Sequence, residues 1–178
     1  MSILIIDDFQ EERDLLFTIL NSAGFGPLLP VGTAREGLQL LGVGKRGKQT
    51  SGIDLVLMDI EMPEIDGLEA CQRIRMEDQL QNLPIIVITA HTEAKDIQAA
   101  YTCGATDYIR KPVIPAELIA RAANALSLKQ EIDARKLREH ELLERTKELD
   151  HAFEQITTLH GTVHICAKCK RVKSDGPH

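Results

Sequence analysis

The sequence predicts an α/β fold in which a doubly wound, five-stranded parallel sheet is followed by a long C-terminal helix that forms a coiled coil. Short aliphatic runs at 3–6, 55–58 and 85–88 alternate with segments of helical periodicity. Repeated strand–helix units of this kind build an open sheet with helices on both faces. Residues 116–160 contain neither proline nor glycine, as expected of one uninterrupted helix.

The first aliphatic run leads into a predicted helix at Glu11 to Asn21, where Asp8 and Glu11 have the spacing of a capping box. Thr33 and Glu36 repeat that spacing before the next helix. Between the two helices, the segment from Phe25 to Val31 contains one glycine and two prolines. Because proline is tolerated mainly on sheet edges, this segment predicts an edge strand.

Further helices are predicted at Gly67 to Arg75 and at Lys95 to Cys103, with Gly104 placed to stop the latter. The segment from Gly42 to Gly52 contains the pattern GVGKRG, which matches a dinucleotide-binding fingerprint. That fingerprint follows a strand and opens a helix, whereas this segment follows a helix that ends near Leu41. A loop is the better interpretation.

Length and composition predict one compact domain with an extension, because 178 residues with 43% hydrophobic content can form one ordinary core. The net charge of −6 argues against a nucleic-acid partner. No apolar run has the length of a membrane span or of a signal peptide, so we expect a cytoplasmic protein without a membrane partner. The four cysteines do not form a secreted disulfide framework, and reduced thiols are expected.

Five polar side chains are expected at the carboxyl ends of strands: Asp7, Asp8, Asp59, Thr89 and Lys111. Ligands of doubly wound folds bind at this edge of the sheet. Three neighbouring carboxylates repel one another unless a cation neutralises them, and carboxylate oxygens suit Mg²⁺. A divalent ion, an ammonium and a hydroxyl around one carboxylate can surround three phosphoryl oxygens, which predicts phosphoryl transfer to an aspartate.

Four sequence motifs resemble those of the receiver domain of two-component response regulators. The resemblance covers about residues 1–125 and implies a flavodoxin-like sheet. The motifs are Ile5-Ile-Asp7-Asp8, Leu57-Met-Asp59-Ile-Glu-Met-Pro63 with Asp66-Gly67, Ile88-Thr89-Ala90, and Gly104-Ala-Thr-Asp-Tyr108-Ile-Arg-Lys111-Pro112.

The resemblance implies that Asp59 is the phosphoacceptor and that a histidine kinase or a phosphotransfer protein is the donor. Asp8, Asp59 and the backbone carbonyl of Glu61 would bind Mg²⁺, and Asp7 would help through water. Lys111 would pair with the phosphoryl group. Such a receiver catalyses its own phosphorylation and dephosphorylation, and the sequence shows no separate enzymatic domain beside it.

The resemblance also implies a switch in which Thr89 moves toward the phosphoryl oxygens and Tyr108 turns inward. It further implies a cis peptide bond between Lys111 and Pro112. His91 follows this motif, and a solvated side chain is the preferred interpretation over a phosphohistidine relay or a metal ligand.

The long helix carries a heptad seam between residues 118 and 163, which predicts a parallel homodimer. Pairs of opposite charge, Glu131 with Lys136 and Arg145 with Asp150, favour parallel pairing. The alternative is one solvated helix, since both signs of charge are mixed along it. The predicted domains are thus a receiver at 1–125, a fifth helix and coiled coil at 116–160, and a poorly ordered tail at 161–178.

The tail contains Cys166 and Cys169, whose spacing permits zinc binding, although the second cysteine pair of a strong zinc motif is missing. Two functions remain open. The chain is either a phosphorylation-dependent switch or the regulatory input fragment of a larger signalling enzyme, such as a nucleotide cyclase or a kinase, with its output beyond residue 178. A haloacid-dehalogenase-like phosphatase is disfavoured because no DxDxT-like motif surrounds the candidate aspartates.

Overall fold

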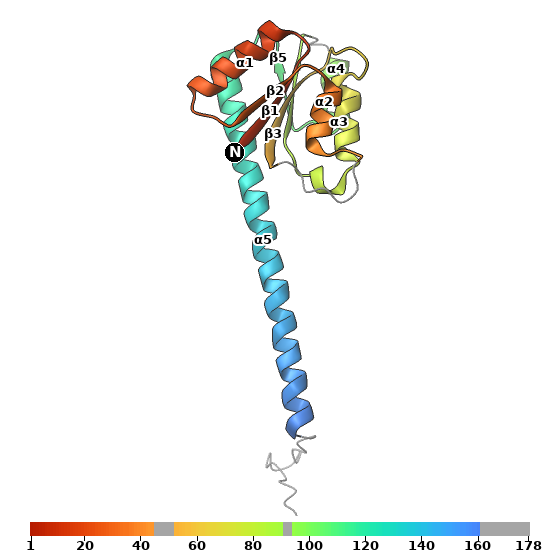
Figure 1. Cartoon of the computed structure of the whole chain (residues 1–178), viewed down its shortest axis with the longest axis vertical. Helices are drawn as coiled ribbons and strands as arrows, with labels where there is room; N and C mark the ends of the chain where they lie inside the picture. Colours follow the sequence, from red (N-terminus) through yellow and green to blue (C-terminus); the bar gives the residue numbers. More distant parts are fainter. Residues whose placement is uncertain (45–51, 91–93, 161–178) are drawn as a thin grey trace, which may run out of the picture. The chain divides into compact units, whose positions relative to one another are not determined.

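The computed structural model describes residues 1–44, 52–90 and 94–160, and within them the side chains of all but 94–97 and 153–160. Five parallel strands form one sheet in the order β2-β1-β3-β4-β5, which confirms the predicted doubly wound fold (Figure 1). The elements are β1 (Ser2–Ile6), α1 (Gln10–Ser22), β2 (Leu28–Val31), α2 (Ala34–Leu41), β3 (Ile53–Asp59), α3 (Gly67–Arg75), η1 (Asp78–Leu80), β4 (Ile85–Thr89), α4 (Ala94–Thr102), β5 (Asp107–Arg110) and α5 (Pro115–His160).

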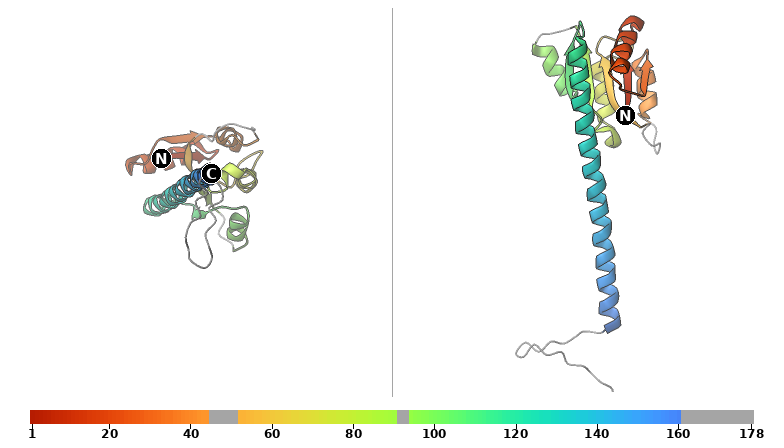
Figure 2. Two further views of the ribbon diagram at one scale, coloured as in Figure 1. Left: turned by 90° about the horizontal axis from the view of Figure 1, so that it is seen from below. Right: turned by 90° about the vertical axis from the view of Figure 1, so that its left-hand side faces the viewer.

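Two buried clusters, one on each face of the sheet, form the core. Alternate side chains of the central strands point to opposite faces, so Leu55 and Leu57 join one cluster while Val56 and Met58 join the other. Helix α1 and the beginning of α5 cover the first face, and α2, α3 and α4 cover the second (Figures 1 and 2). This double coverage explains why the strand sequences are almost entirely aliphatic.

Strand β2 lies at the edge of the sheet and pairs only with β1, as its prolines predict. Pro30 is aligned with Ile5 of β1 in this pairing. A proline lacks the N–H that a further neighbouring strand would need, so the edge position costs no sheet hydrogen bond.

The predicted capping box at Asp8 is wrong. Helix α1 begins after Phe9, whose side chain makes no capping hydrogen bond, and it is Asp7 Oδ1 that accepts a hydrogen bond of 2.9 Å from the Phe9 N–H. The second box is half confirmed. Thr33 Oγ1 accepts from the Glu36 N–H at 3.2 Å, but the Glu36 carboxylate accepts from the Gly32 N–H rather than from Thr33.

Helix α5 belongs to both of the compact units of the chain, residues 1–132 and 133–178. Leu118 and Ala125 are buried in the sheet domain, and Arg121 is paired there with Asp107 and Glu117. These first positions of the predicted seam therefore stabilise the sheet domain itself. In the second unit, every side chain described, from 133 to 152, is exposed.

Several predictions fall on residues outside the described ranges: the loop at 45–51, His91, and the tail with Cys166 and Cys169. Within the described ranges, Cys71 and Cys103 are free thiols, and Lys111 and Pro112 are joined by a cis peptide bond, both as predicted. The helices of these ranges include none that is long and apolar enough to cross a membrane.

Candidate functional site

The candidate site forms where the carboxyl ends of four neighbouring strands meet. Asp7 follows β1, Asp59 ends β3, Thr89 ends β4 and Lys111 follows β5. The strand order places β1, β3, β4 and β5 side by side, and the Lys111 N–H donates to the Thr89 carbonyl at 2.9 Å. The topology alone thus brings side chains from distant parts of the sequence to one edge of the sheet.

The three acidic residues form a close cluster. One carboxylate oxygen from each of Asp7, Asp8 and Asp59 lies within 4.8 Å of the other two. Asp7 and Asp59 are almost fully buried, and Asp8 is half-buried. Among the described residues, Asp7 Oδ2, Asp8 Oδ1 and Asp59 Oδ2 find no hydrogen-bond partner. Three buried oxygens without donors are costly by themselves but suit a hard divalent cation, so this donor set fits Mg²⁺.

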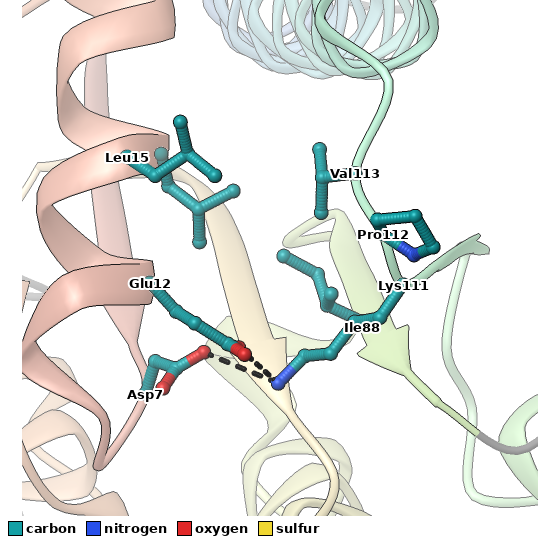
Figure 3. A pocket seen from close by; sticks show the side chains of 8 residues that line it. Asp7, Glu12, Leu15, Ile88, Lys111, Pro112 and Val113 are labelled. Carbon is teal, nitrogen blue, oxygen red and sulfur yellow. Dashed lines mark ion pairs between the residues drawn. The ribbon is translucent and has the colours of Figure 1, made fainter.

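Lys111 provides positive charge beside the acidic cluster, and Figure 3 shows its ion pairs with Asp7 and Glu12. Its Nζ lies 3.0 Å from Asp59 Oδ1 and 3.6 Å from Asp7 Oδ2, and it also forms an ion pair with Glu12 Oε2. The Lys111 side chain is only 18% exposed, so these charges interact more strongly than they would in bulk water. A buried ammonium in this position can form an ion pair with an anionic group attached to Asp59.

Burial dominates the protonation of the two inner carboxylates. It raises the pKa of Asp7 to about 6, although the Phe9 N–H and the Lys111 ammonium act in the opposite direction. Burial also raises the pKa of Asp59, again opposed by Lys111. For Lys111, burial lowers the pKa, but hydrogen bonds to Glu12 and Asp59 outweigh it and leave the pKa above its ordinary value. The site therefore strongly favours additional positive charge.

The turn between β1 and α1 is held in place by Asp7 and Arg13. Arg13 Nη1 donates to the Asp7 backbone carbonyl at 2.6 Å, while the Asp7 side chain accepts from the Phe9 N–H. These two bonds fix the backbone on both sides of Asp8. The Asp7 side chain is thus held in place by the turn that it stabilises.

Gly67 allows the chain after Asp59 to pass close to the start of α3. A Cβ at position 67 would lie 2.1 Å from the Asp59 backbone carbonyl oxygen and 2.9 Å from the Cα of Ile60. The Gly67 N–H also donates to the Ile60 carbonyl at 2.9 Å. Only glycine fits here without displacing the backbone of Asp59 and Ile60.

The two residues predicted to act as a switch lie in different surroundings. Thr89 is buried at the end of β4. Tyr108 on β5 is half-buried, packs edge to face against Tyr101 with ring centroids 6.1 Å apart, and lies 5.9 Å from the Arg121 guanidinium. Thr89 is therefore enclosed in the core, whereas the Tyr108 ring is partly exposed at the surface.

A small cavity opens beside the acidic cluster, between α1 and the segment that follows β5 (Figure 3). Its volume is about 150 Å³. Leu15, Leu16 and Ile88 line its apolar part, while Asp7, Glu12 and Lys111 line its charged part. The ion pairs of Lys111 therefore lie at the wall of an accessible cavity.

Comparison with known proteins decides the family. The sequence profile described as the response regulator receiver domain matches residues 3–123. The chain belongs to the response regulator receiver family. Receiver domains are the phosphorylated switches of two-component signalling, and the acidic cluster with Lys111 is of the kind typical of a receiver Mg²⁺ site.

Three relatives illustrate the match. The chain is 34% identical over 145 residues to the cyclic di-GMP phosphodiesterase response regulator RpfG of Xanthomonas campestris pv. campestris, covering 82% of this chain and 37% of RpfG. It is 36% identical over 120 residues to the transcriptional regulatory protein GltR of Pseudomonas aeruginosa, covering 67% of this chain and 46% of GltR. The crystal structure of a response regulator receiver domain protein from Clostridium thermocellum matches with a TM-score of 0.63 and 26% identity, covering 74% of this chain and 98% of that one. The match thus spans less than half the length of both RpfG and GltR.

The sequence prediction placed the receiver site at the correct edge of the sheet but missed part of its surroundings. Asp7, Asp8, Asp59 and Lys111 come together as expected, and Thr89 lies at the end of the adjoining strand. The role of Glu12 was not foreseen. The position of Glu12, four residues after Asp8, was the sequence signal that could have indicated this contact. The neighbouring Glu11 has the same charge, however, and the residue at which α1 begins decides which of the two glutamates faces Lys111.

Proposed function

We propose that Asp59 accepts a phosphoryl group from the phosphohistidine of a histidine kinase or a phosphotransfer protein. The observation that carries this proposal is the buried carboxylate of Asp59, which has one oxygen 3.0 Å from the Lys111 ammonium and the other without a hydrogen-bond partner among the described residues. The negative charge on Oδ1 is thus balanced by Lys111, and no donor among the described residues competes for Oδ2, which is available to attack phosphorus.

The same cluster supports a magnesium site. Asp8, Asp59 and the backbone carbonyl of Glu61 would hold the ion, with Asp7 acting through water. When bound, Mg²⁺ supplies the positive charge that balances the phosphoryl oxygens and the attacking carboxylate. The orphaned oxygens of Asp7, Asp8 and Asp59 support this assignment.

The residues of the chain then carry the transfer. An Asp59 carboxylate oxygen attacks phosphorus in line with the leaving imidazole, the O–P bond forms as the P–N bond breaks, and the electron pair of that bond stays on the imidazole nitrogen. Lys111 donates hydrogen bonds to the phosphoryl oxygens and balances their charge. Hydrolysis returns Asp59 to its carboxylate and releases phosphate, so the receiver catalyses both reactions on itself.

Modification of Asp59 would be transmitted by Thr89 and Tyr108. The Thr89 hydroxyl moves toward the phosphoryl oxygens, and the Tyr108 ring turns inward into the space that Thr89 leaves. The position of Thr89 at the end of β4 and the half-buried state of Tyr108 on the neighbouring β5 support this coupling. The surface formed by α4 and β5 changes as a result.

We further propose a parallel homodimer through residues 118–163. Because Leu118 and Ala125 are buried in the receiver, the part of the seam available for pairing starts at Leu128. Leu128, Leu142 and Leu149 then follow at heptad positions, and all three are exposed. These leucines share one heptad position, which Arg135 occupies between Leu128 and Leu142, and their exposure favours a dimer over a single solvated helix.

A second candidate function is that of an input module for an output enzyme such as a nucleotide cyclase or a kinase. The match to RpfG supports it, because 145 matched residues extend beyond the 121 residues that the receiver profile covers. RpfG carries a phosphodiesterase name, so a receiver followed by a similar segment occurs in a signalling enzyme. The two candidates are compatible, and coding sequence continuing past His178 into a catalytic domain would favour the second.

Intact-mass spectrometry tests the phosphoacceptor. The chain is incubated with acetyl phosphate and Mg²⁺, and we expect one added phosphoryl group that is absent in Asp59→Ala. Asp54→Ala is the matched control, because Asp54 lies on the same strand at its opposite end and accepts a hydrogen bond from the Ser2 N–H. Equal labelling of Asp59→Ala and the unmodified sequence would exclude Asp59 as the acceptor.

A further inference from the structure

Glu12 is a charged group at the site that the proposed phosphoryl transfer does not use. It lies in the first turn of α1, its side chain is 43% exposed, and its Oε2 is paired with Lys111 Nζ. Its neighbour Glu11 is exposed and lies in the same helical turn. Two adjacent residues of equal charge therefore differ in one respect: Glu12 contacts the lysine of the site.

Three carboxylates compete for Lys111. The ammonium has three hydrogens, and Glu12, Asp59 at 3.0 Å and Asp7 at 3.6 Å surround it. Asp7 and Asp59 belong to the acidic cluster, whereas Glu12 lies outside that cluster, on the wall of the cavity that Asp7 and Lys111 also line. Glu12 thus competes with the two cluster carboxylates for the Lys111 ammonium.

The charge of Glu12 also reaches the reacting group. Its negative charge acts to raise the pKa of both Asp7 and Asp59, which means that its field extends to their carboxylates. An anion in this place repels an incoming phosphoryl donor, which is itself an anion. Both effects, competition for Lys111 and repulsion of the donor, oppose formation of the aspartyl phosphate.

We propose that Glu12 is a positioning residue whose ion pair with Lys111 competes with the phosphoryl group for the ammonium and so slows phosphorylation of Asp59. This inference rests on the proposed phosphoacceptor function. In the unmodified protein the Lys111 ammonium contacts Asp59 Oδ1 at 3.0 Å and is shared with Glu12 through the Glu12–Lys111 ion pair. Lys111 must give up that ion pair, or share it, when it donates to the phosphoryl oxygens, and the strength of the pair sets part of the barrier.

The test compares Glu12→Gln with Glu11→Gln. Each variant removes one negative charge from the first turn of α1, so both alter the helix terminus equally. The rate of phosphorylation by acetyl phosphate with Mg²⁺ is followed by intact mass. We expect Glu12→Gln to react about 3- to 10-fold faster than the unmodified chain, which corresponds to a barrier change of the size of one partly exposed ion pair. Glu11→Gln is expected to stay within about 2-fold of the unmodified chain.

Salt dependence separates this charge effect from a structural one. Raising the ionic strength from about 0.05 to about 0.5 M shortens the Debye length and should reduce the gap between Glu12→Gln and the unmodified chain. A structural effect would leave the gap unchanged, and that result would overturn the proposal. Equal rates in Glu12→Gln and Glu11→Gln, or a slower Glu12→Gln, would also overturn it. If the unmodified chain does not react at all, the phosphoacceptor function fails instead.

Discussion

Lys111 Nζ lies 3.0 Å from Asp59 Oδ1, although the two residues are 52 positions apart in the chain and β4 lies between the strand that ends at Asp59 and the strand that precedes Lys111. This ion pair links the end of β3 to the segment that follows β5. It also leaves the second oxygen of Asp59 without a hydrogen-bond partner among the described residues.

Without a divalent cation, the protein should lose stability as the pH rises from about 4 to about 6. Burial raises the pKa of Asp7 to about 6, whereas in the unfolded chain it has its ordinary value of 3.8, so the folded state binds more protons in this window. The free energy of unfolding then falls with pH, by about 3 kcal/mol for a shift of this size. Urea denaturation in EDTA measures it, and Asp7→Asn should show a shallower fall. An identical pH profile for Asp7→Asn would contradict the prediction.

Added Mg²⁺ should stabilise the protein at neutral pH. A ligand that binds only the folded state raises the free energy of unfolding by about 2.7 kcal/mol when its concentration is a hundred times its Kd. Thermal unfolding across a magnesium series measures the effect. Asp8→Asn removes one carboxylate of the cluster and should lose most of the response. A Tm of the unmodified chain that does not depend on Mg²⁺ would argue against the site.

Gly67→Ala should destabilise the receiver by about 1–3 kcal/mol, because the new methyl group meets backbone atoms that cannot move aside cheaply. The nearest of them is the Asp59 carbonyl oxygen, at 2.1 Å from the added carbon. Gly32→Ala is the control, since a Cβ there would meet only the Arg13 guanidinium, at 3.5 Å or more. Urea denaturation of both variants compares the two sites. A loss in Gly32→Ala equal to that in Gly67→Ala would show that close packing at Asp59 is not the cause.

Leu142→Glu should weaken the proposed homodimer, whereas Leu137→Glu should not. Both leucines are about equally exposed, at 64% and 61%, and both lie on the same stretch of α5. Leu142 falls on the heptad seam, but Leu137 falls at the position farthest from it. Light scattering at micromolar concentration measures the molar mass of each variant. A monomeric unmodified chain, or equal effects of the two substitutions, would contradict a dimer formed through this seam.

The sequence was sufficient to predict the sheet because hydrophobic runs and turn residues are local signals. Pro30 placed β2 at the edge, and the aliphatic sequence around Val56 indicated a strand covered on both faces. Contacts that depend on exact helix starts were not predictable in the same way. Helix α1 begins at Gln10 rather than one residue later, and Asp7 instead of Asp8 holds the turn that precedes it.

The heptad pattern of α5 shows a second limit of local reasoning. Leu118 and Ala125 fit a helix–helix seam in the sequence, yet both are buried against the sheet. An apolar stripe on a helix indicates that this face is buried, but it does not indicate which surface buries it. The sheet covers this face at the start of α5. Light scattering of the Leu142→Glu variant tests whether a second chain covers the seam beyond Leu128.

Locating the phosphoryl group within the chain tests the central claim most directly. The chain is treated with acetyl phosphate and Mg²⁺, the acyl phosphate is reduced with borohydride to homoserine, and the peptides are sequenced by mass spectrometry. We expect homoserine at position 59 and its loss when EDTA replaces Mg²⁺. Homoserine at position 7 or 8, or equal labelling with and without Mg²⁺, would contradict the account.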